Sequence, residues 1–383
     1  MILSKLFVDF FNSERAGGVI LIICTVFSLA LTNLYPDYGY LWTTAIGGHH
    51  LVHWINDGLM TIFFLLIGLE LEREVYIGEL SNFKNALLPI VAAVGGMIFP
   101  ALLYFIINAD GGYISGIGIP MATDIAFALS VLYLLGNRIP AALKVFLTAF
   151  AVIDDLGAIV IIALFYTDTI SWLNLGIASG IFVFLLALNR MKVHALWPYL
   201  ILGSFMWYFM LRSGVHATIS GVLLAFAIPF GNGDEHSPSY KLQHFLHKPV
   251  AFLILPLFAL ANTSILVSDN FYLQMGSLIS LGIMAGLLVG KPLGIVLLTY
   301  VSVKFRICSL PLNIDWKHII GAGLLGGIGF TMSIFISLLA FDDQELQNQS
   351  KIAVMFISFI AGLIGYLWLK TFAKNEPQKT MKQ

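Results

Sequence analysis

Two adjacent carboxylates, Asp154 and Asp155, lie within an apolar stretch, LTAFAVIDDLGAIVIIALFY, that contains no other charged residue. Consecutive residues of a helix point about 100° apart, so the two side chains face different partners. Like charges this close also separate the proton affinities of the two groups. Hard cations prefer oxygen ligands. The pair can therefore exchange protons for a hard cation.

Two further ionisable residues, Asp124 and Lys291, lie in apolar stretches. Ionisable groups at bilayer depth are costly and usually mark an ion or proton path. The flanks of Lys291, SLGIMAGLLVG and PLGIVLLTYV, prevent its ammonium group from easily reaching water. Lys291 is the only buried cation available to pair with one of the acids. A purely structural ion pair is the alternative interpretation.

The composition requires a membrane around these residues. The chain of 383 residues is 59% hydrophobic and 11% charged, with a mean hydropathy of +0.90, which no soluble domain of this size shows. A spanning helix needs about 20 apolar residues. Such stretches lie near residues 17–34, 52–73, 86–107, 114–135, 141–166, 172–189, 195–211, 214–230, 249–268, 275–301, 318–340 and 352–372. We therefore predict an all-α polytopic membrane protein with twelve transmembrane helices.

The placement of the basic residues supports this even number of spans. With both termini in the cytoplasm, all but three of the 20 Lys and Arg residues lie on the cytoplasmic side, the exceptions being Arg212, Lys351 and Lys291. Such a bias sets the orientation of multi-pass proteins. We expect one membrane domain, 1–383, with a short interfacial helix at 1–16 and a flexible cytoplasmic tail at 373–383. The net charge of −1 favours no nucleic acid partner.

Two of the predicted spans contain glycine and proline that interrupt a helix. The fourth contains SGIGIPMATDIAF and the eleventh GAGLLGGIGFTMSIF. Matched interruptions in the two halves of a chain point to the binding site of a transporter. Close packing through small residues is the alternative for the eleventh span. It is what we expect of the glycines that recur every fourth residue in the tenth, Gly282, Gly286, Gly290 and Gly294.

The strings ATDIAFAL, IDDLGAI, VGKPLGI, GIGFTMSIF, FFLLIGLELERE and ILPLFALAN resemble those of the NhaA family of bacterial sodium/proton antiporters, over nearly the whole chain. That family is a known example of interrupted-helix transporters, so the agreement is not independent. The resemblance implies twelve spans, inverted repeats of spans 3–5 and 10–12, and spans 4 and 11 crossing as broken helices at mid-membrane. It also implies a secondary active transporter of the bacterial inner membrane, with no enzymatic activity and no cofactor. Its expected action is pH-dependent, electrogenic exchange of cytoplasmic sodium, and also lithium, for external protons, serving sodium and pH homeostasis.

The resemblance also assigns roles to the buried residues. Asp155 becomes the main sodium ligand, with Thr123 near the ion. Asp154 becomes a proton carrier beside it and the partner of Lys291. Asp124 neutralises the two positive helix ends at the crossing and Lys291 the two negative ends, in agreement with the sign of the helix dipole.

The family's pH-responsive cluster falls at the cytoplasmic side, on Glu70, Arg73, Glu74, His244 and His247. A solvated helix end is the alternative interpretation of Glu70, Arg73 and Glu74. His244 and His247 share one face if the segment is helical. This chain has Gln243 where many members have an acid, so we expect an altered pH response.

Other functions and assemblies stay open at this point. A sodium-coupled solute symporter with a similar crossed-helix architecture is the main alternative. His49, His50 and His53 superficially resemble a zinc site but lack an evident fourth ligand. Family members can dimerise through a β-hairpin between spans 1 and 2. The connection YPDYGYLWTTAIGGHHLVHW is shorter than that hairpin usually needs, so a homodimer is only a modest expectation.

Overall fold

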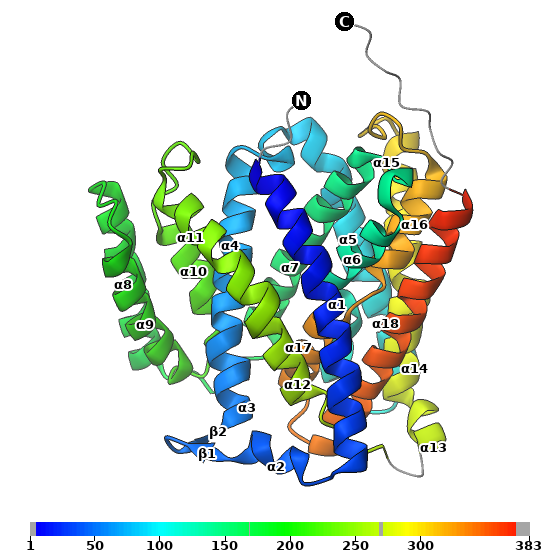
Figure 1. Ribbon diagram of the computed structural model, residues 1–383, viewed down its shortest axis with the longest axis horizontal. Helices are drawn as coiled ribbons and strands as arrows, with labels where there is room; N and C mark the ends of the chain where they lie inside the picture. The colour runs from blue at the N-terminus through cyan, green and yellow to red at the C-terminus, as the bar shows by residue number, and fades with distance from the viewer. Residues whose placement is uncertain (1–4, 168, 268–270, 373–383) are drawn as a thin grey trace, which may run out of the picture.

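The computed structural model describes residues 5–167, 169–267 and 271–372, which are mostly helical (Figure 1). The α-helices are α1 Lys5–Leu34, α2 Tyr38–Thr43, α3 Leu51–His53, α4 Met60–Tyr76, α5 Phe83–Asn108, α6 Ile125–Leu134, α7 Ala141–Phe165, α8 Trp172–Arg190, α9 Leu196–Leu211, α10 Ile219–Ala227, α11 Pro238–Pro249, α12 Leu255–Asn262, α13 Phe271–Met275, α14 Leu278–Ala285, α15 Lys291–Lys304, α16 Trp316–Gly326, α17 Phe330–Ala340 and α18 Gln344–Phe372. Short 3₁₀ turns are η2 Glu79–Ser81, η3 Ile114–Met121 and η4 Gly136–Arg138.

Three π-helical segments widen longer helices. They are η1 Trp54–Leu59 before α4, η5 Val250–Ile254 before α12, and η6 Gly286–Gly290 before α15. A π-turn frees backbone groups from the regular hydrogen-bond ladder and is frequent at functional sites. Lys291 follows η6 directly, which places a widened turn next to the buried cation.

Nine helices in the described part of the chain are long and apolar enough to cross a membrane. A tenth crossing results if α16 and α17, bent by 43°, form one span. These segments define a polytopic membrane protein. The other two predicted spans, 195–211 and 214–230, correspond to helices of 16 and 9 residues, α9 and α10. Twelve spans therefore stay a prediction.

The predictions for the two ends of the domain differ in what the structure can say about them. Residues 5–16 are helical, as predicted, but they continue into the first span as the single helix α1. Their interfacial position stays a prediction, and the tail at 373–383 lies outside the described residues. In Figure 1, α1 begins and α18 ends at the same end of the helix array.

Glycines bring α5 against α14, η6 and α15. A Cβ atom on Gly95 would overlap the carbonyl group of Gly294, and one on Gly294 would overlap the carbonyl group of Gly95. Gly290 lies similarly close to Pro100, and Gly282 lies against Tyr104. Gly286 lies closest to Pro120 of η3 and also faces the Pro100 carbonyl. The predicted packing role of the tenth-span glycines is confirmed. This contact fixes the helix that carries Lys291.

The connection between α1 and α4 contains a small β-hairpin. Strand β1, Ala45–Ile46, pairs antiparallel with β2, His49–His50, in the register Ala45 to His50 and Ile46 to His49. All four residues are exposed. A hairpin does form in the short connection, because the positive φ angles of Gly47 and Gly48 allow a two-residue turn.

Candidate functional site

The two interrupted segments contact each other at their non-helical residues. On one side, η3 ends at Met121 and α6 begins at Ile125. On the other, α16 ends at Gly326 and α17 begins at Phe330. The Asp124 amide donates to the Ile328 carbonyl at 2.7 Å, and the Thr123 hydroxyl donates to the Gly326 carbonyl at 3.0 Å. Sequence positions about 200 residues apart therefore form one structural unit.

Asp124 bridges the first turns of α6 and α17. Its Oδ1 atom accepts from the Phe127 amide at 2.9 Å and caps α6. Its Oδ2 atom accepts from the amide of Thr331 at 3.0 Å and from the hydroxyl of Thr331 at 2.5 Å. A carboxylate at a helix N-terminus is stabilised by the free amides and by the helix dipole. The site residue that sequence reasoning missed is Thr331, because a hydroxyl does not stand out in an apolar stretch as a charge does.

Lys291 pairs with Asp154. Its Nζ atom lies 2.7 Å from Asp154 Oδ2, and both side chains have no exposed surface. The same ammonium group donates to the carbonyl of Met121, the last residue of η3. A cation at the C-terminal end of a helical segment is favoured by the partial negative charge there. Lys291 thus contacts one acid and one helix end, whereas the resemblance implies Asp154 and two negative helix ends.

Asp155 faces a different space from Asp154, as expected from their positions on α7. Asp155 lines a cavity of about 30 Å³ together with Glu70, Asp124 and Thr331. Among the described residues, Oδ1 of Asp154 and Oδ1 of Asp155 are buried without a hydrogen-bond partner. A buried polar atom without a partner is costly, and a cavity of this size holds one or two water-sized species. The arrangement suits a small cation or protons.

The predicted pH-responsive residues lie around the ends of α4 and α11. His247 Nδ1 is 3.6 Å from Glu70 Oε1, which links this cluster to the cavity at Asp155. The carboxylate of Glu74 accepts from the Glu79 amide at 3.0 Å. Arg73 lies over the ring of Tyr240, and His244 stacks against the same ring. His247 is buried whereas His244 is exposed, so the two histidines face different surroundings.

A buried acid at this end, Glu72, was not predicted. It is 4% exposed, accepts a hydrogen bond from the Ser239 hydroxyl at 3.2 Å and lines a cavity of about 470 Å³. The signal was available, because Glu72 alternates with Glu70 and Glu74 at the end of an apolar run. Its contact ties α4 to α11 beside the residues that were predicted to respond to pH.

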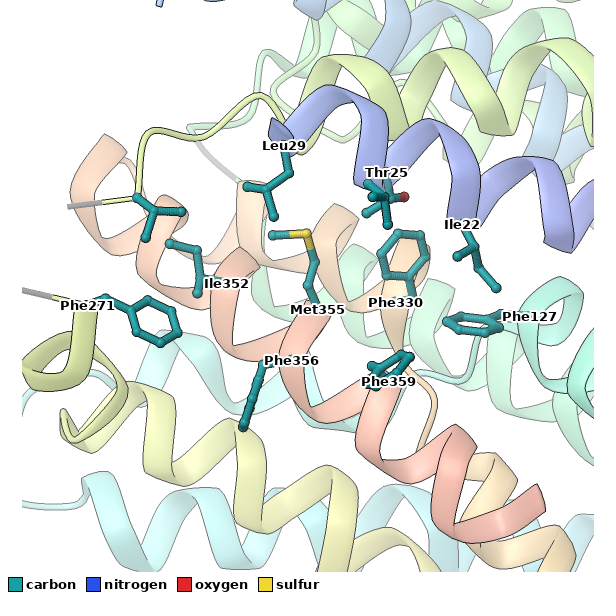
Figure 2. Close-up of a pocket in the computed structure, with 12 residues that line it drawn as sticks. Ile22, Thr25, Leu29, Phe127, Phe271, Phe330, Ile352, Met355, Phe356 and Phe359 are labelled. Atoms are coloured by element: carbon teal, nitrogen blue, oxygen red, sulfur yellow. The ribbon is translucent and has the colours of Figure 1, made fainter. Parts of the chain in front are cut away.

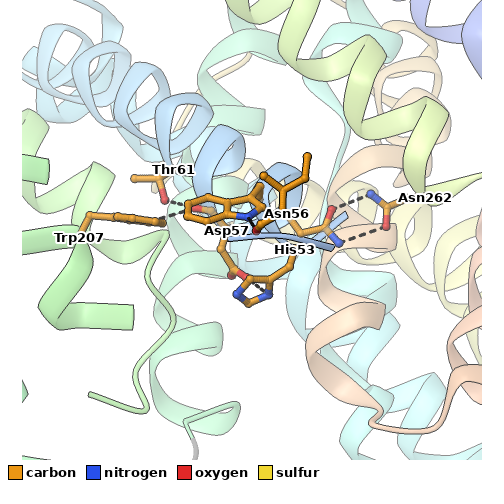
Figure 3. Close-up of polar contacts among 8 residues, drawn as sticks. His53, Asn56, Asp57, Thr61, Trp207 and Asn262 are labelled. Carbon is orange, nitrogen blue, oxygen red and sulfur yellow. Dashed lines mark hydrogen bonds and ion pairs between the residues drawn. The ribbon is translucent and has the colours of Figure 1, made fainter. Parts of the chain in front are cut away.

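A polar cluster lies at the other end of α4, around η1 (Figure 3). His53 Nδ1 is 2.9 Å from Asp57 Oδ2, and the Trp207 indole donates to the Asp57 carbonyl at 3.1 Å. Asn56 and Asn262 exchange amide hydrogen bonds of 2.8 and 3.4 Å, which join η1 to the end of α12. Asp57 is charged within a predicted span, so it could have been noticed from the sequence.

His49, His50 and His53 lie in strand β2 and in the following α3. His49 stacks on His53 with ring centroids 4.6 Å apart, and His50 bonds to the Thr43 carbonyl at 2.5 Å. Within the described ranges, no group of three or more His, Cys, Asp or Glu side chains is arranged to hold a metal ion.

Apolar membrane-crossing helices, two interrupted segments in contact, and buried acids beside a buried lysine define a class of protein, the polytopic membrane transporters. Comparison with known sequences gives the family. Residues 8–369 match the Na⁺/H⁺ antiporter 1 family. The chain therefore belongs to this family.

Several relatives cover almost the entire chain. The Na(+)/H(+) antiporter NhaA of Flavobacterium psychrophilum is 62% identical over 377 residues, which are 98% of each chain. Na(+)/H(+) antiporter NhaA 1 of Flavobacterium johnsoniae is 59% identical over 372 residues, 97% of this chain and 98% of the relative. The Na(+)/H(+) antiporter NhaA of Dechloromonas aromatica is 56% identical over 382 residues, 98% of each.

Proposed function

We propose that this protein exchanges cytoplasmic sodium for external protons. The observation that carries the proposal is that one carboxylate oxygen of Asp154 and one of Asp155 are buried without a hydrogen-bond partner in the described part of the chain. Asp155 also lines a cavity of water size. A proton or a sodium ion can each satisfy such an oxygen, but not both at once. Membership of the Na⁺/H⁺ antiporter 1 family supports the same exchange.

Asp155 is the main sodium ligand in this mechanism, with Thr123 near the ion. When both acids are deprotonated, their oxygens attract a cation that has lost part of its hydration shell. When a proton binds Asp155, the ligand charge disappears and sodium is released. Protons and sodium compete for the same oxygens, so a site that alternates only when it is occupied couples the two fluxes. The apparent affinity for sodium then rises as protons are removed.

Asp154 and Lys291 complete the charge balance. Asp154 shares its negative charge with the Lys291 ammonium 2.7 Å away, so binding sodium or a proton at this acid weakens the ion pair. Two acids serve a single cation, and exchange of more than one proton for each sodium ion moves net charge. We therefore infer electrogenic transport, with lithium as a second substrate because it is also a small, hard cation.

Asp124 and Thr331 hold the crossing while the site alternates between the two sides. The Asp124 carboxylate binds the amide ends of both α6 and α17. It has no free role as an ion ligand as long as these bonds persist. The interrupted segments can therefore move as one unit around the fixed acids.

A solute symporter is less well supported. Pockets for organic ligands have volumes of roughly 300–1,000 Å³, whereas the cavity at Asp155 measures about 30 Å³. A cavity at Asp155 large enough for an organic solute would require separation of residues that now contact each other at the crossing. The small cavity favours bare ions.

The topology forms part of the proposal. We infer twelve spans in the bacterial inner membrane, with spans 4 and 11 crossing near mid-membrane, inverted repeats at spans 3–5 and 10–12, and both termini in the cytoplasm. With this orientation, most of the Lys and Arg residues lie on the cytoplasmic side of the membrane. The exposed hairpin of β1 and β2 offers strand edges that can pair with a second copy, so a homodimer is included.

The experiment is an exchange assay with purified protein reconstituted into vesicles with an acid interior and a fluorescent pH indicator. Sodium added outside, in the absence of any organic solute, should collapse the pH gradient. Vesicles containing the Asp155→Asn variant serve as the control for leakage. A gradient that survives sodium, together with sodium-dependent uptake of a labelled organic solute, would support the symporter instead.

A further inference from the structure

An elongated apolar crevice of about 300 Å³ runs between α1 and α18 (Figure 2). From α1 it is lined by Ile22, Thr25, Val26 and Leu29, and the facing stripe of α18 consists of Ile352, Met355, Phe356 and Phe359. The spacing i, i+3, i+4, i+7 on both helices marks one face of each. The crevice therefore follows the helix axes for about 10 Å, at 1.5 Å per residue.

The exposure of the lining residues changes from rim to floor. Val26 and Phe359 at the rim are 62% and 63% exposed, whereas Phe127 and Phe330 are 7% and 3% exposed. Figure 2 shows the Phe330 ring between Thr25 of α1 and Phe359 of α18. The crevice is thus open to the surroundings of the protein and closed at its inner end.

The chemistry of the lining selects a hydrocarbon. Among the lining residues that the structure describes, Thr25 is the only one with a polar side chain, and its hydroxyl donates to the Leu21 carbonyl of its own helix at 2.8 Å. None of these described side chains is left to recognise a polar ligand. Because α1 and α18 both carry segments long and apolar enough to cross a membrane, we expect membrane lipids next to the open rim.

We propose that this crevice is a binding site for one acyl chain of a membrane phospholipid. An acyl chain is unbranched, apolar and aligned roughly with the spanning helices, as the crevice is. Leaving the space empty would forfeit the dispersion contacts of its walls. The polar headgroup would remain outside the crevice.

The floor of the crevice is the back of the crossing. The rings of Phe127 and Phe330 meet edge to face with centroids 5.8 Å apart. The Phe127 amide donates a hydrogen bond to the Asp124 carboxylate. Phe330 directly precedes Thr331, whose hydroxyl donates to the same carboxylate. A bound acyl chain thus packs against the two phenylalanine rings, next to the residues that hold the two interrupted segments together. This second role rests on the proposed function, but the binding itself does not.

The test is photo-crosslinking with a phosphatidylcholine that carries a diazirine on one acyl chain, reconstituted with the full-length protein. Peptides that contain 22–29 and 352–359 should carry at least fivefold more adduct than the lipid-facing segment around Val183, which is 63% exposed on α8. Met355→Trp fills the crevice and should reduce the adducts on 22–29 at least fivefold. Leu29→Phe is a milder filling variant should Met355→Trp fail to fold, and Val183→Trp should leave those adducts unchanged.

Adducts on 22–29 no more abundant than those around Val183, or insensitive to both filling variants, would overturn the proposal. A disulfide between two copies of a Val26→Cys variant, formed with a mild oxidant and absent from the unaltered protein, would assign the crevice to a second copy and would also overturn the proposal. Because crosslinking does not depend on transport, a failed exchange assay leaves this result interpretable. The same vesicles also allow a separate measurement. The rate at which sodium collapses the pH gradient, compared between Met355→Trp and the unaltered protein, shows whether the bound acyl chain affects exchange.

Discussion

The ammonium nitrogen of Lys291 lies 2.7 Å from a carboxylate oxygen of Asp154, and neither side chain has any exposed surface. The other oxygen of Asp154 is buried without a hydrogen-bond partner in the described part of the chain. Only one of the two carboxylate oxygens of Asp154 therefore has a partner that compensates its charge. This state suits a carrier, because a fully satisfied carboxylate would have no reason to accept a proton or a cation.

The first prediction concerns the two adjacent acids. Asp155→Asn and Asp154→Asn should each abolish coupled exchange, because an amide retains volume and an oxygen but cannot cycle a proton. Sodium should raise the melting temperature of the unaltered protein at high pH, since binding to the native state stabilises it. It should no longer do so for Asp155→Asn. Normal exchange by either variant would show that the role assigned to that acid is wrong.

The second prediction concerns the ion pair. Lys291→Ala should lower the free energy of unfolding by about 3–5 kcal/mol, because it leaves the Asp154 carboxylate buried and uncompensated. Lys291→Arg, which keeps the charge, should cost less. Thermal unfolding in detergent measures both. Adding Asp154→Asn to Lys291→Ala should recover part of the loss, and an unchanged melting temperature for Lys291→Ala alone would contradict the ion-pair interpretation.

The third prediction concerns the crossing. Thr331→Val removes the 2.5 Å hydroxyl bond to Asp124 and should cost about 1.5–3 kcal/mol, the range for hydrogen bonds to charged groups. Thr299→Val is the matched control, because the Thr299 hydroxyl is buried without a partner in the described structure. It should be neutral or stabilising. Equal melting temperatures for the two variants would indicate that the bond to Asp124 contributes nothing.

The fourth prediction concerns the backbone contact between α5 and α15. Gly95→Ala should destabilise the protein by about 1–3 kcal/mol, because its methyl group would overlap the Gly294 carbonyl. Gly180→Ala on α8 meets nothing within 4 Å and should be neutral or slightly stabilising. Melting temperatures of the two alanine variants decide the matter. A Gly95→Ala variant as stable as Gly180→Ala would mean that the two helices can separate freely.

Much of the candidate site could be predicted because charge stands out in an apolar sequence. Asp124, Asp154, Asp155 and Lys291 were recognisable for this reason. The residues alone left open which of the adjacent acids pairs with Lys291, because a 100° step fixes their divergence but not their direction.

Other features depend on packing that no local pattern reveals. Thr331 has an uncharged side chain, and its bond to Asp124 spans 207 positions of sequence. The predicted span 214–230 is helical only over Ile219–Ala227, because the chain turns through His216 and Thr218 before the helix starts. The widened turns η1, η5 and η6 have no sequence signature. These features arise from contacts between helices.

The last prediction concerns regulation at α11. Gln243 is buried and lies one helical turn before His247, which is 3.6 Å from Glu70. In the proposed mechanism, competition between protons and sodium at Asp155 would by itself make the apparent sodium affinity rise with pH, without a separate sensor. A switch beyond this competition needs groups that change charge near neutral pH, and histidine is the natural one. Gln243 cannot change charge, so we expect a shallower or shifted pH profile than in relatives with an acid there.

Gln243→Glu tests this expectation directly. A carboxylate at i, i+4 on the same helix face would favour the protonated imidazole of His247 and compete for it with Glu70. The profile of exchange between about pH 6 and 9 should therefore steepen or move, whereas the rate at saturating sodium and high pH should stay nearly the same. Gln349→Glu, in the first turns of α18, is a control substitution of the same type away from this cluster. Apparent sodium affinity and maximal rate, measured across this range for all three proteins, give the answer, and superimposable curves would mean that position 243 has no part in pH control.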